Sequence, residues 1–189
     1  MSSTSATRDV PWVPAAVVGI AAYVLEYLVT YLWQANDVRE QLQGINAIIE
    51  LLGGQAIPAW KAVGWLFYNA HFVSFTRPGL GGGRVSTNLI ASGNAPQLLY
   101  VVPPLFLLVG GFLLARYVGL DDPTDGALAG TVVSLGYAIP AWFCVFAFRV
   151  TSDGAWIGPD LVTGIVVAGV VYPVVFGAIG GAIAGAVEG

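Results

Sequence analysis

The chain has 189 residues, of which 57% are hydrophobic and only 10% are charged, and its mean hydropathy is +0.77. Soluble domains carry about 25% charged residues, and a soluble core does not explain so large a shortfall. Eleven acidic residues against seven basic ones argue against a nucleic-acid-binding surface. The single cysteine, Cys144, excludes an intramolecular disulfide and a metal site built from several cysteines.

Long apolar runs predict an all-α protein, a polytopic bundle of transmembrane helices with four to five spans. A spanning helix needs about 20 mostly apolar residues, and residues 58–76 reach only the lower limit. The predicted spans of this single membrane domain are residues 12–33, 58–76, 97–118, 126–148 and 161–187. We therefore expect a multi-pass protein of the cytoplasmic membrane, with the lipid bilayer as its immediate partner.

Between the first two runs, residues 37–52 predict an amphipathic interfacial helix. Their apolar side chains alternate four and three positions apart, which places them on one stripe of a helix; these are Val38, Leu42, Ile45, Ile49 and Leu52. Asp37 and Glu40 resemble a capping box at the start, and Gly53–Gly54 supplies a stop. We expect this helix to lie on the membrane surface or to cover the bundle.

The longest polar connection covers residues 77–95 and contains several glycines and two arginines. Its glycines do not match a phosphate-binding loop, because the required lysine and the strand–helix context are missing. A flexible or hairpin loop is the simpler expectation. A capping or gating role is the alternative, since long loops are often functional.

Small residues recur at every fourth position in the last two runs and are candidate helix-packing residues. These two ladders are Gly126, Gly130 and Ser134 in one run, and Gly177, Gly181 and Gly185 in the other. A face stripped of side chains lets two helix backbones approach closely within lipid. Two uses remain open. The two runs pack against each other as antiparallel neighbours, or one ladder joins copies of the chain into a homo-oligomer.

Four polar residues within the predicted spans are the candidate site residues: Glu26, Lys61, Asn69 and His71. Ionisable residues inside a membrane are functional candidates by default. At 1.5 Å per residue, Glu26 lies about 10 Å and Lys61 about 5 Å below the same surface, which predicts an ion pair that fixes helix register. Asn69 and His71 lie about 200° apart on a helix, so they serve no common site. We expect all four to face protein or a hydrated pocket rather than lipid.

No catalytic constellation is recognisable, so the chain is predicted not to be an enzyme and to use no catalytic residue, metal or cofactor. One histidine cannot supply two axial haem ligands, and no cysteine pair or histidine–carboxylate cluster is present to hold a metal. The ladders favour a helix-packing component of a homo-oligomer or of a larger membrane complex, without nucleic acid. The alternative is a transporter or channel for ions or small solutes, with a polar path through Glu26, Lys61 and His71.

Membrane orientation is poorly determined by the five predicted spans. They place four basic residues on the side of the N-terminus and three on the other side: Arg8, Arg77, Arg84 and Arg149 against Arg39, Lys61 and Arg116. Cytoplasmic loops are enriched in Lys and Arg. The count favours a cytoplasmic N-terminus only slightly.

One stretch carries a resemblance to a known group of proteins. The sequence GWLFYNAHFV, residues 64–73, combined with four or five spans and a composition low in lysine and rich in acidic and small residues, resembles small multi-pass membrane proteins of haloarchaea. Those proteins have no assigned function. The resemblance implies a membrane location, makes this stretch a hallmark of the group, and implies no activity and no catalytic residue.

Overall fold

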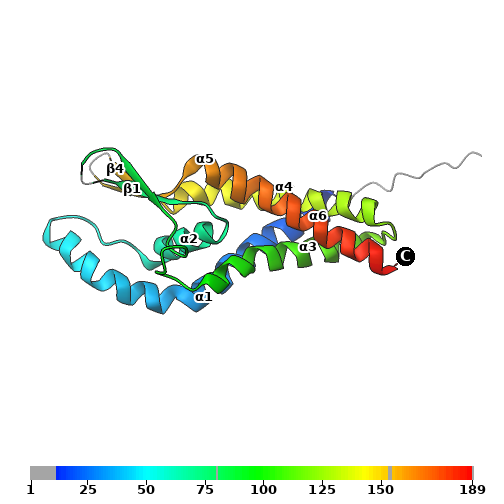
Figure 1. Ribbon diagram of the computed structural model, residues 1–189, viewed down its shortest axis with the longest axis horizontal. Coiled ribbons are helices and arrows are strands. Elements are labelled where there is room, and N and C mark those ends of the chain that lie inside the picture. Colours follow the sequence, from blue (N-terminus) through cyan, green and yellow to red (C-terminus); the bar gives the residue numbers. More distant parts are fainter. Residues whose placement is uncertain (1–11, 80, 153–154, 189) are drawn as a thin grey trace, which may run out of the picture.

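The computed structural model describes residues 12–79, 81–152 and 155–188, and helices dominate it (Figure 1). Among these residues, four helices are long and apolar enough to cross a membrane, which confirms four of the predicted runs as helices of that kind. They are α1 (Trp12–Leu51); α3 (Val102–Val118) with the 3-10 turn η1 (Gln97–Val101) before it; α4 (Pro123–Ala147); and the continuous helix formed by α5 (Leu161–Thr163), the π-helical stretch η2 (Gly164–Val171) and α6 (Tyr172–Glu188).

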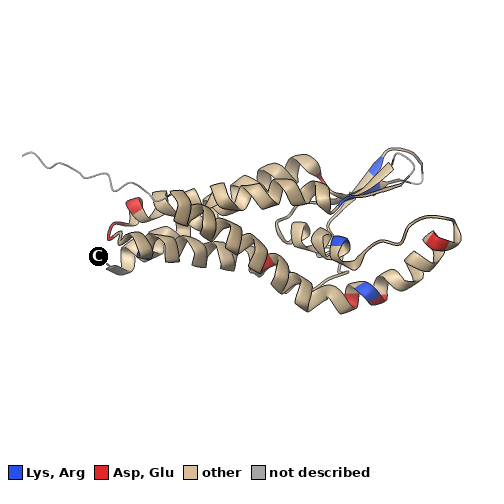
Figure 2. Cartoon of the chain, turned by 180° about the vertical axis from the view of Figure 1, so that it is seen from behind, with Lys and Arg blue, Asp and Glu red and all other residues tan. Residues whose placement is uncertain are grey.

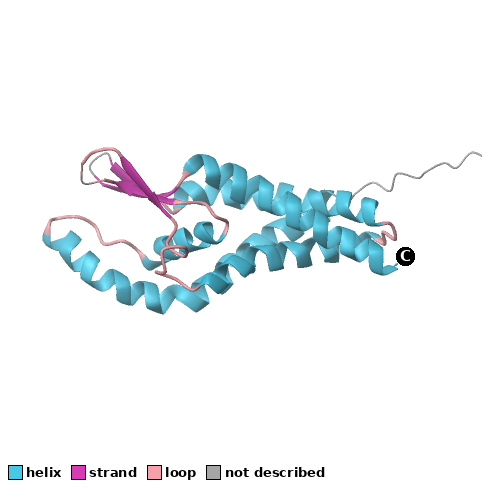
Figure 3. Ribbon diagram, in the orientation of Figure 1, coloured by secondary structure: helices cyan, strands magenta, loops and turns pink. Residues whose placement is uncertain are grey.

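A small antiparallel sheet at one end of the bundle corrects the all-α prediction (Figure 3). Its strands lie in the order β2 (Arg84–Thr87), β1 (Phe75–Pro78), β4 (Ala155–Pro159) and β3 (Val150–Ser152). The hairpin alternative for residues 77–95 is therefore confirmed at β2. A second hairpin, β3–β4, follows α4 and pairs with the first through Phe75 opposite Pro159. Strands of three to five residues are too short to show an alternating pattern in sequence.

The fifth predicted span is wrong, because residues 58–76 form a short helix and a strand. The helix α2 (Ala59–Ala70) has 12 residues, and every residue from Ala62 to Ala70 is buried. A helix that is apolar on all sides belongs inside a protein or a membrane, and here protein surrounds it. The helix ends at Ala70, and the chain then turns at Phe72, whose φ of 59° is left-handed; the Val73 amide N–H closes the turn by donating to the Tyr68 carbonyl at 3.1 Å.

The predicted amphipathic helix 37–52 is not a separate element but the second half of α1. No proline or glycine stands between Trp33 and Gln43, so nothing stops the helix, and Asp37 caps nothing. Val38 and Leu42 are buried against the rest of the protein. The predicted stop is confirmed, since α1 ends where Gly53 takes a φ of 83°.

The two ladders of small residues pack α4 against α6. A methyl group built on Gly130 would lie 2.0 Å from the carbonyl oxygen of Gly177, and one on Gly126 would lie 2.3 Å from that of Gly181. Gly185 meets the Asp122 carbonyl in the same way, while Ser134 is half-buried. Both ladders are thus occupied within one chain, as the antiparallel alternative predicts.

Candidate functional site

Three polar side chains from three different helices meet in the centre of the protein. Glu26 lies in the middle of α1, Tyr137 lies in α4, and His71 is the residue that directly follows α2. None of the three is exposed to solvent. The Tyr137 hydroxyl is hydrogen-bonded to Glu26 Oε2 at 2.5 Å and to His71 Nε2 at 2.7 Å. We call these three residues the buried triad.

The second nitrogen of His71 fixes its tautomer. Nδ1 lies 2.8 Å from the carbonyl oxygen of Phe67, one turn earlier in α2. A carbonyl oxygen only accepts hydrogen bonds, so Nδ1 carries a proton and donates it. Burial lowers the pKa of His71 to about 4, and the hydrogen bond to Phe67 opposes that effect only partly. The imidazole is therefore neutral at neutral pH and offers Nε2 as an acceptor.

Aromatic rings surround the triad. The Tyr23 ring lies 5.2 Å from that of Tyr137, and the Tyr172 ring lies 4.9 Å from that of His71. Within the described residues, Glu26 Oε1 has no hydrogen-bond partner. An unpaired polar atom in such a place is costly when charged, because no solvent screens it.

Lys61 does not form the predicted ion pair with Glu26. Its Nζ donates instead to the carbonyl oxygen of Arg149 at 2.7 Å, and Trp65 Nε1 donates to that of Phe148 at 2.8 Å. The last carbonyls of a helix lack partners within it and attract positive charge. Two side chains of α2 thus complete the C-terminal end of α4, which explains Lys61 without a functional role.

Asn69 and His71 form hydrogen bonds in different parts of the protein, as their predicted separation around the helix requires. Its Oδ1 accepts from the Leu89 amide at 2.8 Å, and its Nδ2 donates to the Val73 carbonyl at 2.7 Å. Asn88 Nδ2 donates to the Asn69 carbonyl at 3.0 Å. The side chain therefore holds the turn after α2 against the segment after β2, and does not cross a helix interface.

Tyr137 is the member of the triad that sequence reasoning missed. Tyrosine is common in apolar runs and carries no charge, so a hydropathy pattern does not distinguish Tyr137 from its apolar neighbours. A signal was nevertheless present: Tyr137 lies seven residues after Gly130, on the face of α4 that the small residues mark as an interior face. A large polar residue on such a face must fill a space left in a neighbouring helix.

Positive charge gathers on the sheet. The guanidinium carbons of Arg84 and Arg149 lie 3.6 and 3.8 Å from the ring centroid of Trp156. Two guanidinium groups cannot share one ring face at such distances, so they stack on opposite faces. Figure 2 shows basic residues concentrated at this end of the molecule. Burial, and the neighbouring charge of Arg84, lower the pKa of Arg149.

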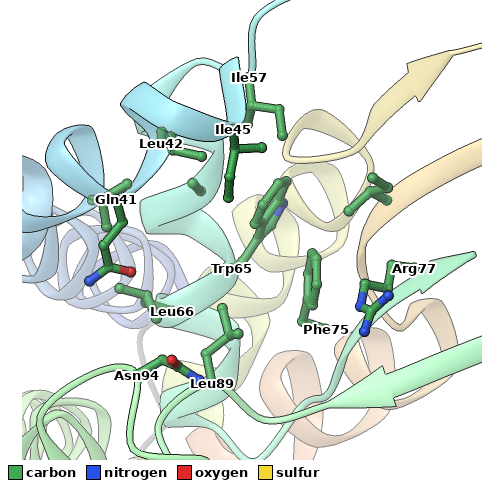
Figure 4. A pocket seen from close by; sticks show the side chains of 13 residues that line it. Gln41, Leu42, Ile45, Ile57, Trp65, Leu66, Phe75, Arg77, Leu89 and Asn94 are labelled. Carbon is green, nitrogen blue, oxygen red and sulfur yellow. The ribbon is translucent and has the colours of Figure 1, made fainter. Parts of the chain in front are cut away.

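A groove of about 370 Å³ separates the second half of α1 from α2 and the sheet (Figure 4). Its walls are mostly apolar and include Leu42, Ile45, Trp65, Leu66, Phe75 and Ile157. Arg77 of β1 stands beside Phe75 at the edge of the groove (Figure 4). In the parts of the chain that are described, no group of three or more His, Cys, Asp or Glu side chains is placed to hold a metal ion.

The fold and the triad define a helical bundle compatible with a membrane, with a polar cluster sealed inside it and a small sheet at one end. The chain belongs to a family of unknown function, DUF7978, whose model matches residues 1–188. No curated protein matches the chain, and no solved structure matches it.

Proposed function

We propose that this chain is an integral protein of the cytoplasmic membrane that acts as a non-enzymatic component of a homo-oligomer or a larger membrane complex. The observation that carries the proposal is the second half of α1. The whole of α1 has 40 residues and, at 1.5 Å per residue, is about 60 Å long. This is twice the thickness of a bilayer's hydrocarbon core, which is roughly 30 Å. The second half therefore extends beyond the lipid, at the same end of the molecule as the sheet (Figure 1).

Apolar side chains remain uncovered on this extension. They are Ile45, Ile48, Leu51 and Leu52, of which Leu51 is 85% exposed. Lipid covers exposed apolar residues within the bilayer, but outside it a cluster of this kind marks an interaction surface. The apolar groove next to Ile45 continues the same surface. Since the glycine ladders are already occupied within the chain, association through this extension is the arrangement that we propose.

Removing two of these side chains is expected to weaken association. We expect the double variant Ile48→Ser, Leu51→Ser to lose about 1.5–3 kcal/mol of association free energy per side chain. Its dissociation constant should therefore rise at least about 100-fold. The measurement is the mass of the intact particle, purified in mild detergent. Gln43→Ser, an exposed change on the same helix, is the matched control and should keep the wild-type mass. A wild-type protein that is monomeric at every concentration would refute the proposal.

The orientation that we propose places the sheet in the cytoplasm, and the start of α1 and the end of α6 outside. With four spans, five basic residues lie on the side of the sheet: Arg39, Lys61, Arg77, Arg84 and Arg149. Arg116, in the last turn of α3, belongs to the other side. Among the described basic residues, five against one reverses the preference of the earlier count.

Single-cysteine labelling tests this orientation. In a background with Cys144→Ala, we expect a membrane-impermeant thiol reagent to label Asp121→Cys in intact cells, and to label Gln55→Cys only after lysis. Both positions are exposed and lie at opposite ends of the bundle. The reverse pattern would refute the orientation. Release of the protein by alkaline carbonate without detergent would refute the membrane location itself.

Transport of ions or small solutes is the second candidate, and the buried triad favours it. Ionisable groups sealed inside a membrane bundle mark ion or proton pathways in many proteins. Lys61 lies outside such a path, because it is bound to the end of α4. Ion flux through liposomes that contain the monomer alone would favour this candidate over the complex component.

A further inference from the structure

The geometry points to the buried triad as a proton-binding site: Glu26, Tyr137 and His71 together hold one exchangeable proton, which at neutral pH resides on the Glu26 carboxyl group. Three hydrogen bonds carry this inference: one joins His71 Nδ1 and the Phe67 carbonyl at 2.8 Å, one joins the Tyr137 hydroxyl and His71 Nε2 at 2.7 Å, and one joins the same hydroxyl and Glu26 Oε2 at 2.5 Å. The site does not depend on the association surface proposed above.

Counting protons along the chain of hydrogen bonds leaves two complete arrangements. In the uncharged arrangement, the Glu26 carboxyl O–H donates to the Tyr137 oxygen, and the Tyr137 O–H donates to His71 Nε2. In the charged arrangement, protonated His71 Nε2 donates to the Tyr137 oxygen, whose O–H donates to the Glu26 carboxylate. The charged arrangement arises from the uncharged one when the Tyr137 proton moves to His71 Nε2 and the Glu26 proton moves to the Tyr137 oxygen. The triad neither gains nor loses a proton in this step.

Removing the shared proton leaves the triad incomplete. A Glu26 carboxylate and a neutral His71 both require a donor, and the single hydroxyl hydrogen of Tyr137 serves only one of them. Glu26 Oε2 and His71 Nε2 would then be two fully buried acceptors 3.6 Å apart. Such an unpaired buried group is costly, and more so when it is charged. The triad therefore binds a proton rather than releasing it.

The surroundings select the uncharged arrangement. No side chain of the triad reaches solvent, and separating charge in a dry site is expensive. The titratable groups that face the triad are Tyr23 of α1, Tyr68 of α2 and Tyr172 of α6. These phenols carry no charge at neutral pH, so among the described neighbours none compensates an imidazolium. The lowered pKa of His71, about 4, agrees with a neutral ring.

The chain contains a single histidine, so nitrogen NMR on protein labelled at histidine reports the site without assignment. We expect the shifts of a neutral imidazole protonated at Nδ1 in the wild-type protein at neutral pH. Infrared difference spectra between the wild type and Glu26→Gln should show the carbonyl stretch of a protonated carboxyl group in the wild type only. Glu50→Gln, which alters an exposed carboxylate, is the control and should leave that band unchanged.

Tyr137→Phe separates a proton chain from simple packing, because it removes only the bridging oxygen. We expect it to move both the carboxyl stretch of Glu26 and the Nε2 shift of His71, which a purely structural ring would leave in place. An imidazolium signal in the wild type at neutral pH, or a Glu26 band that belongs to a carboxylate, would overturn the proposal. The wild-type measurements decide this even if a variant fails to fold.

Discussion

Gly130→Val is expected to destabilise the bundle by at least about 3 kcal/mol, the upper end of the usual cost of overpacking. A Cβ atom at this position would lie 2.0 Å from the Gly177 carbonyl oxygen and 2.7 Å from the carbonyl carbon. Backbone atoms cannot rotate away as a flexible side chain does, so α4 and α6 must separate. The close backbone contact that holds helices together in lipid is then lost. Thermal unfolding in detergent measures the effect.

Gly44→Ala is the matched control for that substitution. Gly44 also lies inside a helix, but no atom comes within 4 Å of a Cβ built there. The change should therefore stabilise the protein by about 0.5–1 kcal/mol, the intrinsic preference of a helix for alanine over glycine. Equal effects of the two substitutions would show that helix propensity, and not the contact between α4 and α6, decides the role of Gly130.

Tyr137→Phe is expected to lower the free energy of unfolding by about 2–6 kcal/mol, the second large effect. The hydroxyl group is the only hydrogen-bond partner of Glu26 Oε2 and of His71 Nε2 recorded in the described structure, at 2.5 and 2.7 Å. Its removal leaves two buried polar groups unpaired, at about 1–3 kcal/mol each. The free energy of unfolding in detergent gives the value. Tyr117→Phe, at a 74% exposed position, should change little.

A double variant tests whether the cost comes from unpaired polar groups. Adding Glu26→Leu to Tyr137→Phe replaces one of the stranded groups by an apolar side chain of similar size. Replacing both partners of a buried hydrogen bond is often nearly neutral, so the double variant should be more stable than Tyr137→Phe alone. Additive losses would mean that the hydroxyl group acts through packing.

The sequence by itself predicted the four long helices. The four apolar runs are four helices long and apolar enough to cross a membrane. The spacing of Gly126 and Gly130 indicated a close helix contact, because glycine at every fourth position exposes backbone on one face wherever the helix lies. Gly53 likewise marked the end of α1. These properties are local, and local patterns are sufficient to predict them.

Only the tertiary structure decided which groups meet. Glu26 and Tyr137 are 111 residues apart, and their contact depends on how α1 crosses α4, which no local pattern encodes. That crossing rests on Gly19 and Gly136, whose added Cβ atoms would lie 2.2 Å from the Val133 carbonyl and 2.0 Å from the Ala16 carbonyl. Neither glycine belongs to the two ladders that were predicted.

The same limit explains the error over residues 58–76. Hydropathy measures how apolar a segment is, not whether lipid or protein covers it, and α2 is apolar because protein surrounds it. The sheet escaped prediction because Phe75 of β1 and Pro159 of β4, which pair across the two hairpins, are 84 residues apart in sequence, and the two strands pair at only two positions. The apolar side chains of a segment determine that it is buried. Which other segment it contacts depends on the fit of their side chains and on hydrogen bonds, which form only when distant parts of the chain come together.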